Sequence, residues 1–163
     1  MLTERQARAS AELAERTGID IPMIDRLVRT FYGKVREDGM LAPVFDERIS
    51  DWEPHLVRMG EFWSSVALMT GVYHGRPMEK HLPLPVDARH FDRWLQLFRE
   101  AAREVCPPAA AAHFIERAER IAQSIEMGIA VSHGVLLMKG ERFRRADAEV
   151  SVPPDRGDPP AAA

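Results

Sequence analysis

Apolar residues recur along this chain at helical spacing, and no segment shows the sustained alternation of apolar and polar residues that a half-buried strand needs. The clearest stripe lies between residues 20 and 37. Its apolar side chains fall at i, i+3, i+4, i+7, i+8 and i+11, which places them on one face of a helix. This stripe consists of Ile24, Leu27, Val28, Phe31, Tyr32 and Val35. The pattern predicts an all-α fold.

Start and end signals mark further helices on either side of this one. Residues 3–16 are rich in helix formers but carry only a weak apolar stripe, and Gly18 ends them. Ser50 and Glu53 have the spacing of a capping box and predict a helix over about residues 51–70.

The second half of the chain contains two long predicted helices. Residues 71–86 are rich in glycine and proline and allow only a one-turn helix, between Pro77 and Pro83. A long helix begins near Asp87, and Pro107 and Pro108 separate it from the last one.

These signals divide the 163 residues into three parts. Residues 1–18 form an amino-terminal helical arm, residues 19–138 form one globular domain, and the proline-rich residues 139–163 are expected to be a disordered tail. The start MLTERQARAS lacks the apolar core of a signal peptide, and no stretch is long and apolar enough for a membrane span. We therefore expect a cytoplasmic protein without a membrane partner.

Composition excludes several kinds of site. A net charge of −3 argues against nucleic acid as a partner. The single cysteine, Cys106, excludes an intramolecular disulfide and a cysteine-clustered zinc site, and we expect it to be inert. His113 is expected at the surface or at a helix edge.

Four residues could carry chemistry. His81 lies on the one-turn helix, where an imidazole is either an inward metal or haem ligand or an ordinary surface histidine. Tyr32, His55 and Trp94 each project a polar group from the apolar stripe of a different helix. Singly, each is explained as a satisfied core residue; together they indicate a cavity that holds a hydrogen-bond acceptor.

Four segments in order carry a family resemblance: FYGKVREDGMLAPVFD, PHLVRMGEFWSSV, YHGRPMEKHLPLP and HFDRWLQLF. Over about residues 20–130 the chain resembles truncated haemoglobins of the third group. The resemblance implies a shortened globin fold, with helices packed two over two around haem b (iron protoporphyrin IX). His81 would be the proximal iron ligand, Tyr32 and Trp94 the distal hydrogen-bond donors, and His55 a further donor or a gate.

The resemblance also implies which residues surround the haem. The apolar wall would include Phe45, Met59, Phe62, Leu84, Phe91 and Leu95. Cationic groups near the pocket mouth are candidates to pair with the propionates, or are simply solvated charges: Arg58, Arg76 and Lys80.

Three functions remain open at this point. The first is a globin that binds oxygen and other diatomic ligands, such as carbon monoxide, for ligand chemistry or scavenging and not for bulk transport. The second is a haem enzyme that acts as a nitric oxide dioxygenase or on peroxide, with a reductase as a candidate partner. The third is a haem-free helical interaction module.

Overall fold

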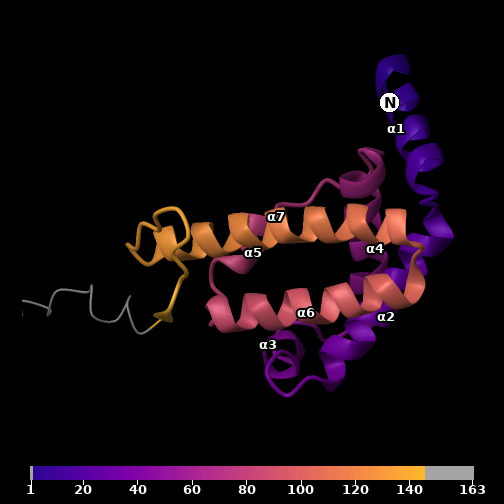
Figure 1. Ribbon diagram of the computed structural model, residues 1–163. Coiled ribbons are helices and arrows are strands. Elements are labelled where there is room, and N and C mark those ends of the chain that lie inside the picture. The colour runs from indigo at the N-terminus through magenta and orange to yellow at the C-terminus, as the bar shows by residue number, and fades with distance from the viewer. Residues whose placement is uncertain (1, 146–163) are drawn as a thin grey trace, which may run out of the picture.

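The computed structural model describes residues 2–145, and within them the chain is entirely helical, with no strand. The predicted all-α class is confirmed. Seven helices follow one another along the chain (Figure 1). They are α1 (Glu4–Thr17), α2 (Ile21–Glu37), α3 (Ala42–Asp46), α4 (Trp52–Leu68), α5 (Pro77–His81), α6 (Ala88–Val105) and α7 (Pro108–Ser132).

The four long helices that follow α1 form two packed pairs. Helix α6 lies along α7, and α4 packs against α2. Helix α2 also packs against α6, so the two pairs share one core (Figure 1). The short helices α3 and α5 lie in the connections between the long ones.

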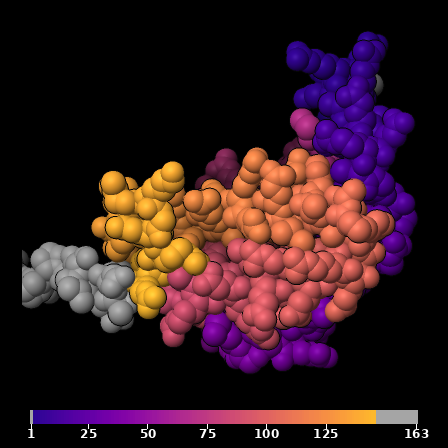
Figure 2. Space-filling model, in the orientation of Figure 1, coloured from indigo at the N-terminus to yellow at the C-terminus, as the bar shows by residue number. Residues whose placement is uncertain are grey.

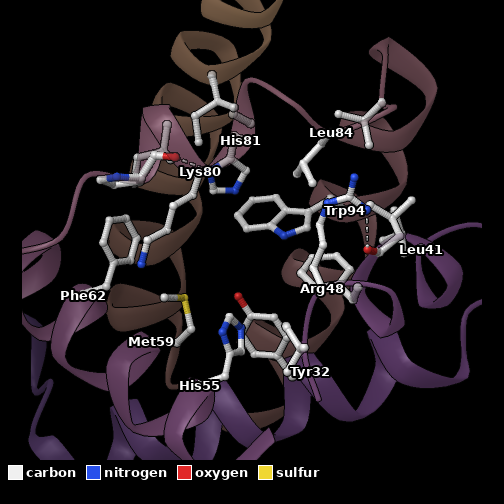
Figure 3. A pocket seen from close by; sticks show the side chains of 18 of the residues that line it. Tyr32, Leu41, Arg48, His55, Met59, Phe62, Lys80, His81, Leu84 and Trp94 are labelled. Carbon is white, nitrogen blue, oxygen red and sulfur yellow. Dashed lines mark hydrogen bonds between the residues drawn. The ribbon is translucent and has the colours of Figure 1, made fainter. Parts of the chain in front are cut away.

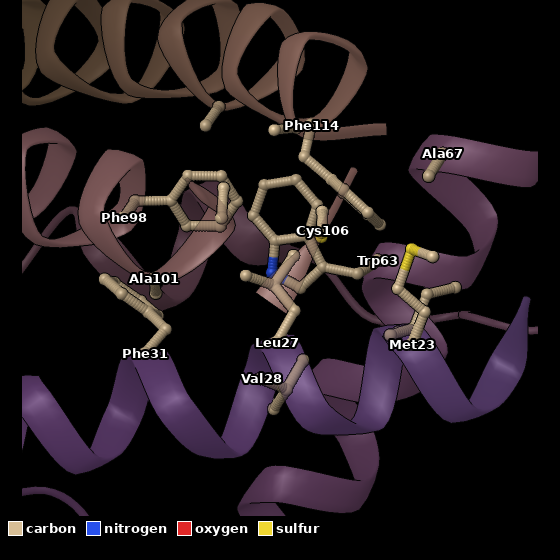
Figure 4. Close-up of a cluster of buried hydrophobic side chains, with 14 of the residues drawn as sticks. Met23, Leu27, Val28, Phe31, Trp63, Ala67, Phe98, Ala101, Cys106 and Phe114 are labelled. Carbon is tan, nitrogen blue, oxygen red and sulfur yellow. The ribbon is translucent and has the colours of Figure 1, made fainter. Parts of the chain in front are cut away.

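Helix α2 forms where the sequence predicts it. The Asp20 carboxylate accepts a hydrogen bond from the backbone N–H of Met23 at 2.9 Å, and Pro22 lies in the first turn, where its missing N–H is not needed. All six predicted stripe residues are buried, as is Met23 (Figure 4).

Aromatic rings join the two pairs of helices. Trp63 of α4 stacks on Phe98 of α6 with ring centroids 4.8 Å apart, and Phe98 meets Phe31 of α2 edge to face (Figure 4). Phe114 of α7 packs against the other side of Trp63. Burial of such rings contributes about 2–3 kcal/mol each to folding.

The predicted start of α4 is wrong in detail. The N-cap is Asp51, without a side-chain cap, and not Ser50 in a capping box. The carboxylate of Glu53 instead binds Arg29 of α2, with Oε1 2.7 Å from Nη2. That interhelical ion pair draws Glu53 away from the helix start.

The predicted boundary at residue 138 also differs from the structure. Residues 139–145 pack against the domain, and Phe143 has an exposed fraction of 0%. Its carbonyl accepts a hydrogen bond from the Ala88 N–H at 2.8 Å. Because the residues around Phe143 are polar, the sequence gives no signal that this side chain is buried. The rest of the predicted tail, residues 146–163, lies outside the described residues.

The amino-terminal arm is buried only toward its carboxyl end. Leu13 and Ala14 pack against the main core and Thr17 is buried, whereas residues 2–8 are exposed. The arm projects from the body of the molecule (Figure 2). Among the described helices, none combines the length and the apolar content needed to cross a membrane.

Candidate functional site

A cavity of about 380 Å³ opens between the two pairs of helices (Figure 3). Its size lies within the range of small-molecule and cofactor sites. It takes side chains from every helix except α1. The lining is mostly apolar, with a small number of polar groups on opposite walls.

His81 lies on one wall of the cavity, at the end of α5 (Figure 3). Its Nδ1 is 2.5 Å from the carbonyl oxygen of Pro77. Because a carbonyl can only accept, Nδ1 carries the proton and Nε2 keeps its lone pair. Burial, opposed by the Pro77 hydrogen bond and aided by the charge of Lys80, lowers the pKa of His81. The imidazole is therefore a neutral base with one nitrogen available as a ligand.

A glycine on α7 sets how closely α5 approaches. A Cβ added at Gly128 would lie 2.4 Å from Sδ of Met78. Met78 therefore occupies the space that any larger residue at position 128 would fill. The side chain of Met78 thereby packs α5, which carries His81, against α7.

Tyr32, His55 and Trp94 line the same cavity, and Figure 3 shows their polar atoms directed into it. The rings of Tyr32 and His55 meet edge to face with centroids 5.1 Å apart. Burial raises the pKa of the Tyr32 hydroxyl, so the group stays protonated and remains a donor.

The electrostatics of His55 keep it neutral. Burial, followed by the positive charges of Arg58 and Lys80, lowers the pKa of His55 to about 4. Its Nε2 is buried and has no hydrogen-bond partner among the described residues. A buried polar atom without a partner costs free energy unless a ligand supplies one.

Most predicted wall residues line the cavity, and one does not. Phe45, Met59, Phe62, Leu84 and Phe91 all reach it. Leu95 is absent from the lining of this cavity and packs against the main core. One residue beyond Trp94, Leu95 is turned about 100° around the helix axis and faces away.

Two of the three predicted cations lie at the cavity. Arg58 and Lys80 line it, but Arg76 is exposed and pairs with Glu79, with Nη1 3.2 Å from Oε1. Arg48 also lines the cavity and was not predicted. Its position depends on α3, a short helix without a sequence signal of its own.

Other lining residues were missed because sequence reasoning assigned them to connections or to the core. Tyr73 follows α4, its backbone N–H donates to the Ser65 hydroxyl at 3.0 Å, and its ring packs on Phe62. From α7, the predicted core stripe supplies Ile121 and Ile125 to the cavity. Further lining residues are Leu41, Val44, Ile49, Trp63, Pro77, Val86, His90 and Ala122.

His113 and Cys106 lie outside the cavity and are buried in the helical core. His113 is buried, contrary to the surface position expected, and its Nε2 is 2.9 Å from the Ala67 carbonyl oxygen. That bond joins α7 to α4. Burial raises the pKa of the Cys106 thiol to about 11, which agrees with the expected inert cysteine.

This arrangement, a cavity between helix pairs with a histidine of free Nε2 on one wall and further polar side chains around it, is typical of globins. Residues 15–127 match the sequence profile of the bacterial-like globins, and the chain belongs to that family. Membership implies haem binding.

Two relatives narrow the class. The chain is 35% identical over 108 residues to the group 3 truncated hemoglobin of Campylobacter jejuni subsp. jejuni, which covers 63% of this chain and 85% of that protein. A crystal structure of a group III truncated hemoglobin from Campylobacter jejuni superposes with a TM-score of 0.62 at 35% identity, covering 66% of this chain and 88% of the other. The predicted group and the shortened globin fold are confirmed.

Proposed function

We propose that His81 would hold haem b in this globin and that the loaded protein would bind oxygen and other diatomic ligands reversibly. One observation carries the proposal: the free Nε2 of His81 faces a cavity whose other wall presents Tyr32, His55 and Trp94. A neutral imidazole is a common axial ligand of haem iron.

The cavity fits such a group in three respects. Its walls are apolar and partly aromatic, as a flat porphyrin requires. The buried Nε2 of His55 has no hydrogen-bond partner among the described residues, and a bound ligand would supply one. Arg48, Arg58 and Lys80 supply positive charge for two propionates.

The protein groups determine what happens to a bound ligand. When bound, haem supplies an iron with one vacant coordination position for a diatomic molecule. The Tyr32 hydroxyl and the Trp94 indole N–H donate hydrogen bonds to the partial negative charge that builds up on such a ligand. In a cavity with few polar groups these bonds are stronger than in water. Slow ligand release follows, which favours ligand chemistry or scavenging over bulk transport.

The absorption spectrum of the purified protein tests the proposal. We expect an intense Soret band, with distinct ferric, ferrous and carbon monoxide forms. His81→Ala removes the axial ligand, so the band should collapse or shift markedly. His74→Ala is the matched control, because His74 is exposed and outside the cavity.

Two results would contradict the proposal. Full haem retention with an unchanged spectrum in His81→Ala would exclude His81 as the ligand. No Soret band in the wild type, even after reconstitution with hemin, would favour the haem-free helical module instead.

A second candidate is an enzyme that converts nitric oxide with oxygen, or turns over peroxide. The observation in its favour is the convergence of Tyr32, Trp94 and His55, since such groups can polarise an O–O bond. Stopped-flow mixing of the oxygenated protein with nitric oxide distinguishes the two. Fast, repeated turnover with a reductase supports the enzyme, whereas one slow reaction supports the binding protein.

A further inference from the structure

The chain turns back after α7 and reaches the first turn of α6 (Figure 1). We name residues 133–145 the carboxyl-terminal strap. Gly134 and Gly140 have φ values of 75° and 85°, in the left-handed region, where glycine is favoured. The similarity to the bacterial-like globin profile ends at residue 127, so the strap is additional to it.

Phe143 anchors the strap. It is fully buried, in a cluster with Val86 before α6 and with Ile125 and Ile129 of α7. Its carbonyl accepts a hydrogen bond from the backbone N–H of Ala88, the first residue of α6, at 2.8 Å. One residue therefore joins the strap to α7 and to α6.

Arg142 makes a second attachment. Its Nε lies 2.9 Å and 3.0 Å from the two carboxylate oxygens of Glu126, and its Nη2 lies 2.8 Å from Oδ1 of Asp92. The Glu126 side chain is only 6% exposed. A buried carboxylate needs a charged partner, so Glu126 holds Arg142 firmly. Nη2 also donates to the Ala88 carbonyl at 3.3 Å.

Hydrogen bonds run from His81 to the strap through the connection between α5 and α6. The His81 carbonyl accepts from the Leu84 N–H at 3.0 Å, and the Leu84 carbonyl accepts from the Val86 N–H at 2.9 Å. The Leu84 carbonyl also lies 3.4 Å from Nη1 of Arg145. Two residues after Val86, the Ala88 N–H donates to the Phe143 carbonyl of the strap. Residues 82–87, the α5–α6 corner, are thus tied to the strap at Leu84 and, just beyond the corner, at Ala88.

We propose that the carboxyl-terminal strap positions His81, with Phe143 and Arg142 as positioning residues that act through the α5–α6 corner. The inference rests on the proposed function, because the direction of the His81 ring matters only if its Nε2 is a ligand. The contacts around a ligating histidine fix its orientation and its strength as a ligand. A strap that holds the corner supplies this constraint from outside the cavity.

The test compares Arg142→Gln and Phe143→Ala with the wild type, using the full chain as purified. Arg144→Gln is the matched control, because it removes the same charge from an exposed residue of the strap. In the two test variants we expect the amides of Leu84, Val86 and Ala88 to exchange hydrogen roughly tenfold faster. We also expect the iron–histidine stretching band of the ferrous protein to shift or broaden, while Arg144→Gln leaves both readouts unchanged.

Either of two results would overturn the proposal. One is an unchanged iron–histidine band together with unchanged exchange at these amides in both variants. The other is faster exchange spread evenly over all helices, which indicates general destabilisation. Arg142→Gln keeps the apolar core intact and gives a result even if Phe143→Ala does not fold. Failure of the proposed function is distinguishable, because the wild type itself would then lack both the Soret and the iron–histidine bands.

Discussion

Tyr32 and Trp94 direct one donor each into the cavity from α2 and α6, and the two can be tested separately. Tyr32→Phe removes only the hydroxyl. The rate of oxygen release should rise roughly 3- to 10-fold, the effect of losing one hydrogen bond. Flash photolysis or stopped-flow kinetics measures this rate.

Tyr73→Phe is the control for Tyr32→Phe. Tyr73 lines the cavity as well, but its hydroxyl lies beside Gly75. We expect no change in oxygen release from this variant. Equal effects of the two substitutions would contradict a specific role for Tyr32.

The lowered pKa of His55 makes stability depend on pH in a defined window. The unfolded chain binds a proton on this histidine below about pH 6.5, whereas the folded chain does so only below about 4. Stability should therefore fall as the pH decreases from 6.5 to 4, because protons favour the unfolded state.

Denaturant unfolding at several pH values tests this prediction by comparing the wild type with His55→Gln. The variant should depend less on pH over the window. The remaining dependence comes from His81 and His113, whose pKa values are also lowered by burial. Identical pH dependence of the two proteins would show that His55 titrates normally.

Site residues could be predicted where the signal is local. Tyr32 follows from the stripe of its own helix, and His81 from the prolines that flank it. Arg48 and Tyr73 could not be predicted, because the path of their connecting segments places them and no periodicity reports it. Arg76 illustrates the same limit: its charge suits a pocket mouth, but in the structure it lies outside the cavity lining and pairs with Glu79.

At the scale of elements, the contact between α5 and α7 predicts that substitutions at Met78 and Gly128 have non-additive effects on the free energy of unfolding. Gly128→Ala forces Met78 to move and should destabilise the protein by about 1–2 kcal/mol. In a Met78→Ala background the same substitution should instead stabilise by up to about 1 kcal/mol, since alanine favours helices over glycine. Denaturant unfolding of the four proteins gives the coupling energy.

Gly33→Ala controls for helix propensity alone. Gly33 lies on an exposed face of α2, and no atom is within 4 Å of an added Cβ. It should stabilise the protein in both backgrounds. Additive effects of Gly128→Ala and Met78→Ala would contradict the contact.

The long helices could be predicted because each carries its own stripe and terminators. Helix α3 has five residues, too few for a periodic signal. Residues 139–145 of the strap fall in the predicted tail because Phe143 is their one fully buried apolar residue, and one apolar residue among charges does not stand out in sequence. The start of α4 was shifted because Glu53 satisfies a partner on another helix. In each case a tertiary contact determines where the segment lies or begins, and the local sequence carries no signal of that contact.

At the scale of the whole molecule, the amino-terminal arm should be partly dispensable. Removing residues 1–8 should change the free energy of unfolding by less than about 0.5 kcal/mol, because residues 2–8 are exposed. Removing residues 1–17 should cost about 2 kcal/mol, because Leu13, Ala14 and Thr17 leave the core. Denaturant unfolding checks both, and equal losses would contradict this division of the arm.

The position of the strap along the chain has a consequence for biosynthesis. A ribosome makes α5 some sixty residues before it makes Phe143, at positions 77–81 against 143. Until Phe143 and Arg142 have been translated, the α5–α6 corner lacks the contacts that hold it. If the strap positions His81 as proposed, the nascent chain completes this wall of the cavity last, and a cofactor held by His81 would be loaded late in the maturation of the protein.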